Sequence, residues 1–144
     1  VVTGTLWTGR LRPDEALQLV GASGVAREVR VRGLQVHGAP ASDAVAGQRT
    51  AVNLAGVSHQ DVARGDVLVG DRAVVVTRRL LIDVRVLADA PPQKHGTRLH
   101  VHLGTTAVLG RLLLPRHRSR DEAPRLVEPG DTARALLRLD TPLP

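Results

Sequence analysis

Three glycine-punctuated stretches between Val29 and Val69 decide the fold: VRVRGLQVHG at 29–38, AGQRTAVNLAGV at 46–57 and VARGDVLV at 62–69. Each stretch is rich in valine and is bounded by glycine, which is typical of short strands joined by tight turns. In the first stretch valine and arginine alternate, so we expect the valines to face a core and the arginines to face solvent or a partner. This region therefore predicts β-structure.

The same pattern extends over the whole chain of 144 residues. Glycine or proline recurs about every ten residues, a spacing typical of a β-sandwich or a barrel. The pattern restarts around residues 70–77, so we expect an all-β fold of two consecutive small antiparallel β-barrels, residues 1–76 and residues 77–144. One helical turn is expected at Ser58–Ala63, with Ser58 as its cap. The predicted strands are Val1–Leu6, Ala16–Val20, Glu28–His37, Thr50–Leu54, Asp66–Val69, Arg79–Leu87, Arg98–Leu103, Ala107–Leu114 and Thr132–Leu139.

Arginine supplies nearly all of the positive charge, since Lys94 is the only lysine in a chain of formal net charge +6. Arginine suits bidentate contacts with phosphate or carboxylate, although a GC-rich coding bias would give the same composition. Trp7 is the only aromatic residue, which argues against a nucleic-acid surface built on base stacking. If the protein binds RNA, we expect contacts with the backbone and with a few pockets.

The chain contains no cysteine, which removes disulfides, thiolate catalysis and zinc–sulfur sites. No apolar run approaches the roughly 18 residues that a membrane span needs. The first residues lack the charged and apolar regions of a signal peptide. These features predict a cytoplasmic protein without membrane association. A chain that opens on a strand and has no methionine is expected to be part of a longer protein.

Motifs for catalysis are missing. There is no G-x-x-x-x-G-K-[ST] phosphate loop and no G-x-S-x-G elbow, so we expect no nucleotide hydrolysis in this chain. The HVH triplet at 100–102 puts two imidazoles on one face of a strand, but a polar face is favoured over a metal site because no third ligand is near. The basic run at 116–120 fits either a solvated loop or a phosphate contact. The RGD triplet at 64–66 fits a turn that leads into a strand.

A candidate anion site lies between two predicted strands. His37 ends one strand and Arg49 begins the next, and strands adjacent in sequence usually pair. We therefore expect both side chains near one rim of the first barrel. An arginine held there by backbone geometry can bind a carboxylate, a phosphate or another small anion.

Several motifs resemble the second domain of translational GTPases of the elongation factor Tu type. VVTGTLWTG at 1–9, AGQRTA at 46–51 and ARGDVL at 63–68 are similar to that domain's opening, central and closing motifs. Within the superfamily, VRGLQVHG at 31–38, the GQR triplet, NLAGV and HVHLGTTAVLGR at 100–111 most resemble selenocysteine-specific elongation factors. The resemblance covers nearly the whole chain and weakens only in the loops Ala90–His95 and His117–Val127.

The chain departs from the family in two respects. Pro13-Asp14-Glu15 stands where the family has a V-G-D turn; without the glycine we expect another turn type, although a carboxylate is kept. The GTPase domain and the mRNA-binding region of the family are expected outside this chain. The resemblance therefore implies no cofactor and no metal here, because GTP and magnesium belong to the GTPase domain.

The resemblance implies a pocket for the 3′ end of an aminoacyl-tRNA. Arg49 matches a pocket position that is asparagine in elongation factor Tu and arginine in the selenocysteine-specific factors. His37 matches an aminoacyl-facing position, and Gln35 matches a position close to the terminal ribose. Arg64 matches an arginine near the pocket in some relatives. Basic residues of the second barrel are candidate contacts to the tRNA backbone: Arg79, Arg98, His100, His102 and Arg111.

The acidity of the selenol group explains why an arginine is expected at position 49. A selenol is far more acidic than a thiol, whose pKa is about 8.5, so selenocysteine is an anion at neutral pH whereas serine is neutral. A guanidinium would favour the selenolate by charge. The implied partners are selenocysteyl-tRNA and, through the parent protein, the ribosome, with a monomeric chain. Two alternatives stay open: the equivalent barrels of another translational GTPase, and a barrel pair that binds proteins instead of RNA.

Overall fold

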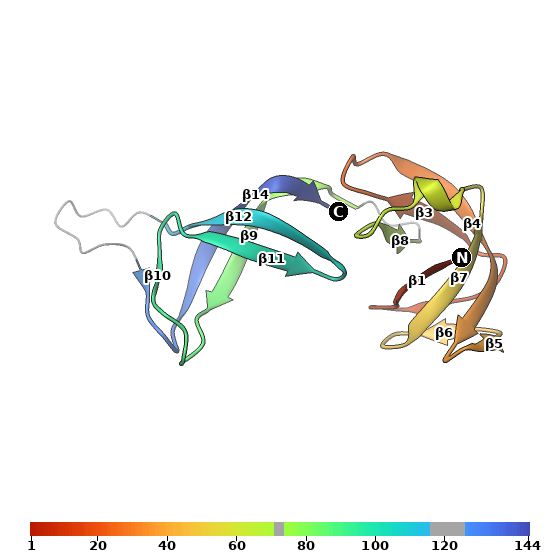
Figure 1. The fold of residues 1–144 in the computed structure, drawn as a ribbon, viewed down its shortest axis with the longest axis horizontal. Coiled ribbons are helices and arrows are strands. Elements are labelled where there is room, and N and C mark those ends of the chain that lie inside the picture. The colour runs from red at the N-terminus through yellow and green to blue at the C-terminus, as the bar shows by residue number, and fades with distance from the viewer. Residues whose placement is uncertain (71–73, 116–125) are drawn as a thin grey trace. The chain divides into compact units, whose positions relative to one another are not determined.

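The computed structural model describes residues 1–70, 74–115 and 126–144. The chain divides into two compact units, Val1–Val75 together with Pro144, and Val76–Leu143. Both units are built mostly of antiparallel strands (Figure 1), so the expected all-β fold is confirmed.

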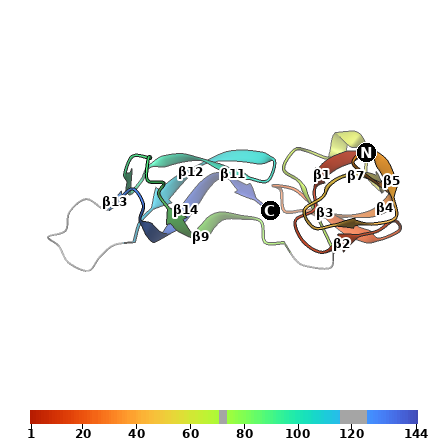
Figure 2. The same cartoon turned by 90° about the horizontal axis from the view of Figure 1, so that it is seen from below.

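The first unit is built around one sheet with the strand order β1-β7-β4-β3-β8, in which β5 also pairs with β4. Strands β1 and β7 lie side by side in it (Figure 2). Strands β2 and β6 form a separate two-stranded pair. The elements are β1 (Val2–Thr5), β2 (Arg10–Leu11), β3 (Ala16–Val20), β4 (Ala26–Val36), β5 (Ala39–Ala41), β6 (Ala44–Val45), β7 (Arg49–Ala55), the 3-10 helix η1 (His59–Asp61) and β8 (Val67–Val69).

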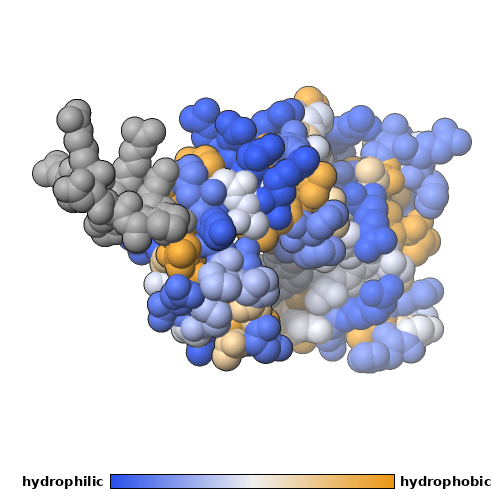
Figure 3. Space-filling view, turned by 60° about the vertical axis from the view of Figure 1, so that its left-hand side comes forward, coloured by the Kyte–Doolittle hydropathy of each residue, from blue (hydrophilic) through white to orange (hydrophobic). Residues whose placement is uncertain are grey.

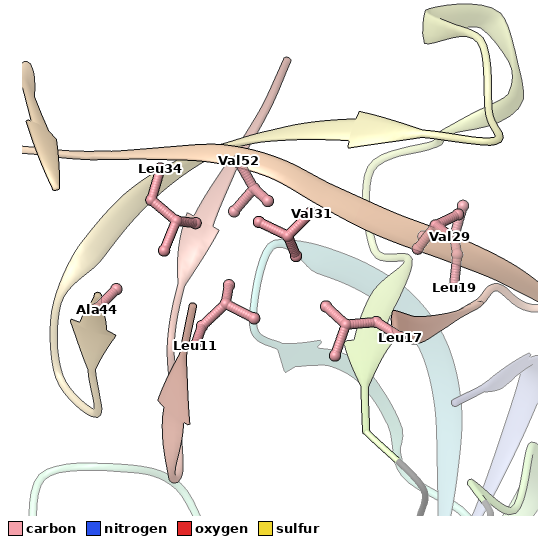
Figure 4. Close-up of a cluster of buried hydrophobic side chains, with 8 residues drawn as sticks. All are labelled: Leu11, Leu17, Leu19, Val29, Val31, Leu34, Ala44 and Val52. Carbon is pink, nitrogen blue, oxygen red and sulfur yellow. The ribbon is translucent and has the colours of Figure 1, made fainter. Parts of the chain in front are cut away.

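Alternating side chains of these strands form the core of the first unit. As expected from the valine–arginine alternation, Val29 and Val31 are only 2% and 0% exposed, whereas the neighbouring arginines are exposed. A bulge between Val31 and Gly33 then shifts the alternation, so that Leu34 points inward. Figure 4 shows the cluster of buried side chains, which are Leu11, Leu17, Leu19, Val29, Val31, Leu34, Ala44 and Val52.

The second unit has a four-stranded sheet with the order β11-β12-β14-β9 and a separate pair, β10 with β13. Its inner face carries buried residues such as Leu112, Ala135 and Leu137. Hydrophilic side chains form broad areas on the face of the molecule seen in Figure 3. The strands are β9 (Thr77–Arg85), β10 (Gln93–Lys94), β11 (Arg98–Leu103), β12 (Thr106–Leu113), β13 (Leu126–Val127) and β14 (Thr132–Leu143).

The longer predicted strands are all present, with ends that differ by up to four residues. The expected helical turn is present as η1, and Asp61 in it accepts hydrogen bonds from the hydroxyl and the backbone N–H of Ser58. Five short strands, β2, β5, β6, β10 and β13, were not predicted, because two or three residues are too few to show an alternating pattern. The basic run at 116–120 lies outside the described residues.

Candidate functional site

The outer face of the first sheet brings three of the expected pocket residues together. In the β4–β7 ladder Gln35 lies opposite Ala51, and in the β1–β7 ladder Thr5 lies opposite Arg49. Side chains alternate along a strand, and Leu34 and Val36 beside Gln35 and Thr50 beside Arg49 point inward. Gln35 and Arg49 therefore share the solvent face as diagonal neighbours, with backbones about 7–8 Å apart.

His37 lies at the end of this ladder. Val36 pairs with Thr50 in β7 and with Ala39 in β5, so His37 and Gly38 form a two-residue turn. Both turn residues have positive φ, 52° for His37 and 81° for Gly38, as a type I′ turn requires. His37 follows the Val36–Thr50 pair on one strand and Arg49 precedes it on the other, so both residues flank the same pair.

The residues before Arg49 explain its position. Gly47 has a φ of 90°, and the N–H of Gln48 donates to the carbonyl of Val45 at 3.2 Å. The side-chain oxygen of Gln48 accepts from the N–H of Val45 at 2.9 Å and closes the turn. In the GQR triplet, glycine thus permits the turn, glutamine stabilises it, and arginine begins β7.

The guanidinium of Arg49 has no carboxylate partner among the residues that the structure describes. Two other arginines of the first unit pair with carboxylates: Arg10 contacts Asp43 at 3.0 Å, and Arg27 contacts Asp61 at 3.3 Å. The side chain of Arg49 is exposed and makes no hydrogen bond or ion pair with any residue that the structure describes. Its guanidinium therefore has all five N–H donors open to a ligand.

Strand pairing does not align Arg64 with this group. It is exposed and precedes β8, the strand at the edge opposite to β1. Strands β4 and β3 lie between β7 and β8 in the strand order. The sheet therefore groups Gln35, His37 and Arg49 without Arg64.

The second unit carries a row of four arginines across its sheet, which we call the arginine row. Arg98 of β11 lies opposite Arg111 of β12, Arg111 lies opposite Arg138 of β14, and Arg138 lies opposite Arg79 of β9. All four side chains are exposed, and residues paired in this way share one face of a sheet. Neighbouring strands are about 4.8 Å apart, so the row spans about 14 Å.

Most of the charge in this row is unneutralised. Arg98 forms an ion pair with Asp140 at 3.1 Å. No carboxylate within residues 1–70, 74–115 and 126–144 pairs with Arg79, Arg111 or Arg138. Arg134, on the same face, is by contrast bound by Asp83, with its Nε 3.0 Å from one carboxylate oxygen. That contact holds the pKa of Asp83 below its usual value.

The two histidines lie beside the arginine row. His100 is opposite Leu109 and His102 is opposite Ala107, and both side chains are exposed on the same face as Arg98. In the described parts of the chain no group of three His, Asp or Glu side chains is arranged to hold a metal ion.

The sequence analysis did not identify Arg138, because only the pairing of β14 with β9 and β12 aligns this residue with the other arginines.

No helix among the described residues has the length and apolar character needed to cross a membrane.

Comparison with known proteins agrees with this architecture. Residues 1–69 match the family elongation factor Tu domain 2, so the first unit belongs to that class of translation-factor domain. The whole chain is 38% identical over 145 residues to a selenocysteine-specific elongation factor of Desulfomicrobium baculatum, covering 21% of that protein. It is 33% identical over 115 residues to the selenocysteine-specific elongation factor of Escherichia coli, with 79% of this chain and 18% of that protein covered.

Along its whole length the chain is thus related to selenocysteine-specific elongation factors. It spans about a fifth of the length of the curated relatives it matches.

Proposed function

We propose that this chain is the tRNA-binding part of a selenocysteine-specific elongation factor, with Arg49 selecting the selenolate of selenocysteyl-tRNA over the hydroxyl of seryl-tRNA. The observation that carries the proposal is the unpaired guanidinium of Arg49 beside Gln35 and His37 on the outer face of an elongation factor Tu domain 2. In this proposal the 3′ end of the tRNA lies on that face.

Charge provides the discrimination. A selenolate and a hydroxyl are of similar size, so a pocket cannot separate them well by shape. A charge-assisted hydrogen bond is worth about 1.5–3 kcal/mol, which corresponds to a preference of roughly 10- to 100-fold. Gln35 provides an uncharged amide that can hydrogen-bond the terminal ribose, and His37 faces the aminoacyl group from the adjacent turn.

The arginine row supports an RNA ligand for the second unit. Like charges placed opposite one another destabilise a sheet, and a polyanion removes that cost. Arginine binds phosphate oxygens with a planar pair of donors, so the row suits the backbone of a tRNA arm. His100 and His102 lie beside the row, where they can contact phosphates or 2′-hydroxyls.

The chain itself performs no catalysis in this proposal. GTP hydrolysis with its magnesium ion belongs to the GTPase domain of the parent protein, which delivers the tRNA to the ribosome in the cytoplasm. This chain acts there as a monomer.

The experiment compares selenocysteyl-tRNA and seryl-tRNA, both on the same tRNA, for binding to the chain at low salt. We expect a preference for selenocysteyl-tRNA that Arg49→Ala removes. Arg32→Ala is the matched control, because it removes another exposed arginine of the same unit and should keep the preference.

Two results would contradict the proposal. A preference that survives Arg49→Ala would show that selection does not depend on this charge. An absence of binding to either tRNA would instead favour a unit that binds proteins.

A further inference from the structure

An exposed arginine alone is a weak discriminator. Ion pairs between solvent-exposed groups change binding constants by less than about fivefold, because water screens them. Arg49 is exposed in the structure. The selectivity proposed above therefore needs a side chain that excludes water when the ligand is bound.

Trp7 follows Arg49's partner strand on the same face. Thr5 lies opposite Arg49. The N–H of Leu6 donates a hydrogen bond to the carbonyl of Gln48 at 3.0 Å, and the carbonyl of Leu6 accepts one from the N–H of Gly47 at 2.7 Å. Leu6 packs against the core, so the alternation of side chains directs Trp7 outward, where it is 58% exposed. Two residues along a strand span about 7 Å, which places Trp7 next in line after Thr5.

The indole side chain of Trp7 is unusual for this chain and is not anchored by a hydrogen bond. Trp7 is the only aromatic residue among 144, and it lies in the short connection between β1 and β2. Its N–H has no hydrogen-bond partner in the part of the chain that the structure describes. A side chain of this size usually contributes to a core or an interface, so its exposure beside Arg49 points to contact with a ligand.

We propose that Trp7 closes over the group held by Arg49 and is a second specificity-determining residue of this site. This inference rests on the proposed function. The indole excludes water from the guanidinium and its anion, which strengthens their attraction. Sulfur makes favourable contacts with the edges of aromatic rings, and the positive edge of the indole attracts an anionic selenolate more strongly than a neutral hydroxyl.

The test measures the ratio of binding constants for selenocysteyl-tRNA and seryl-tRNA in three variants. Trp7→Ser should lower the ratio at least fivefold, whereas Trp7→Phe, which keeps an aromatic ring, should retain most of it. Val25→Ser is the matched control, because Val25 is an exposed apolar residue, 63% exposed, in the turn between β3 and β4 of the same unit. Unfolding midpoints confirm that each variant is folded.

Trp7 also supplies its own signal, since no other residue fluoresces on excitation at 295 nm. Selenocysteyl-tRNA should protect Trp7 from quenching by acrylamide more strongly than seryl-tRNA does. An unchanged ratio in Trp7→Ser together with equal quenching by the two tRNAs would overturn the role of Trp7, while loss of preference in Arg49→Ala would leave the proposed function standing. A preference insensitive to Arg49→Ala would overturn both.

Discussion

Arg111 and Arg138 lie directly opposite each other in adjacent strands of the second unit, although both side chains are positively charged. Paired residues in adjacent strands are about 5 Å apart, and like charges at that separation are destabilising. Each of them also faces a further arginine on its other side, Arg98 and Arg79 respectively. The paired arginines therefore lower the stability of the sheet, and the packing of its side chains does not explain why arginines occupy these positions.

Replacing Arg138 with threonine should stabilise the second unit. Arg138→Thr removes one of the two residues that lie opposite two arginines, so we expect the free energy of unfolding to rise by about 0.2–1 kcal/mol at low salt. The gain should shrink in 1 M salt, where the Debye length is about 3 Å. Urea denaturation at the two salt concentrations measures the effect.

Arg134→Thr is the control for that measurement. It makes the same chemical change on the same strand and face, but Arg134 is paired with Asp83. Its loss should leave stability unchanged or lower it slightly, because an exposed ion pair contributes little to stability. Equal gains in both variants would mean that threonine's preference for strands, and not charge repulsion, is responsible.

Arg138→Thr should also weaken tRNA binding. If the arginine row contacts phosphates, Arg138→Thr should reduce the slope of log binding constant against log salt by about one. Arg134→Thr should change the slope less, since Asp83 already neutralises that charge. Filter binding across a salt series measures both slopes, and identical slopes for the two variants would count against a phosphate contact at Arg138.

The local parts of the fold were predictable from the sequence. Valine–arginine alternation predicted which side of β4 is buried, and the glycines that bound the stretches predicted tight turns such as the one before β7. The turn that lacks the family's glycine places Asp14 in the left-handed region: Asp14 has a φ of 67° and donates its N–H to the carbonyl of Val31 at 2.7 Å. Aspartate tolerates this left-handed conformation better than most residues.

The arginine row could not be predicted, because it depends on pairing between distant segments. Arg79 and Arg138 are brought together by the pairing of β9 with β14, which also contains an irregularity between Arg138 and Leu143. A shift of one residue in that register would turn every side chain of the strand to the other face. Basicity alone indicated Arg79, Arg98 and Arg111 as candidates but gave no reason to include Arg138.

Acid should destabilise the first unit through Asp61. Hydrogen bonds from the side chain and then the backbone of Ser58, followed by Arg27, hold the pKa of Asp61 below its usual 3.8. A carboxylate with a lowered pKa contributes stability that is fully present above the unfolded-state pKa and is lost as the pH falls through the folded-state pKa. We expect Asp61→Asn to remove this part of the pH dependence of stability below about pH 4, measured as unfolding midpoints between pH 2 and pH 7.

Asp43→Asn is the control, because Asp43 also pairs with an arginine but lacks the hydrogen bonds from a capping serine. If the two variants lose stability in parallel at every pH, the capping bonds of Ser58 are not the source.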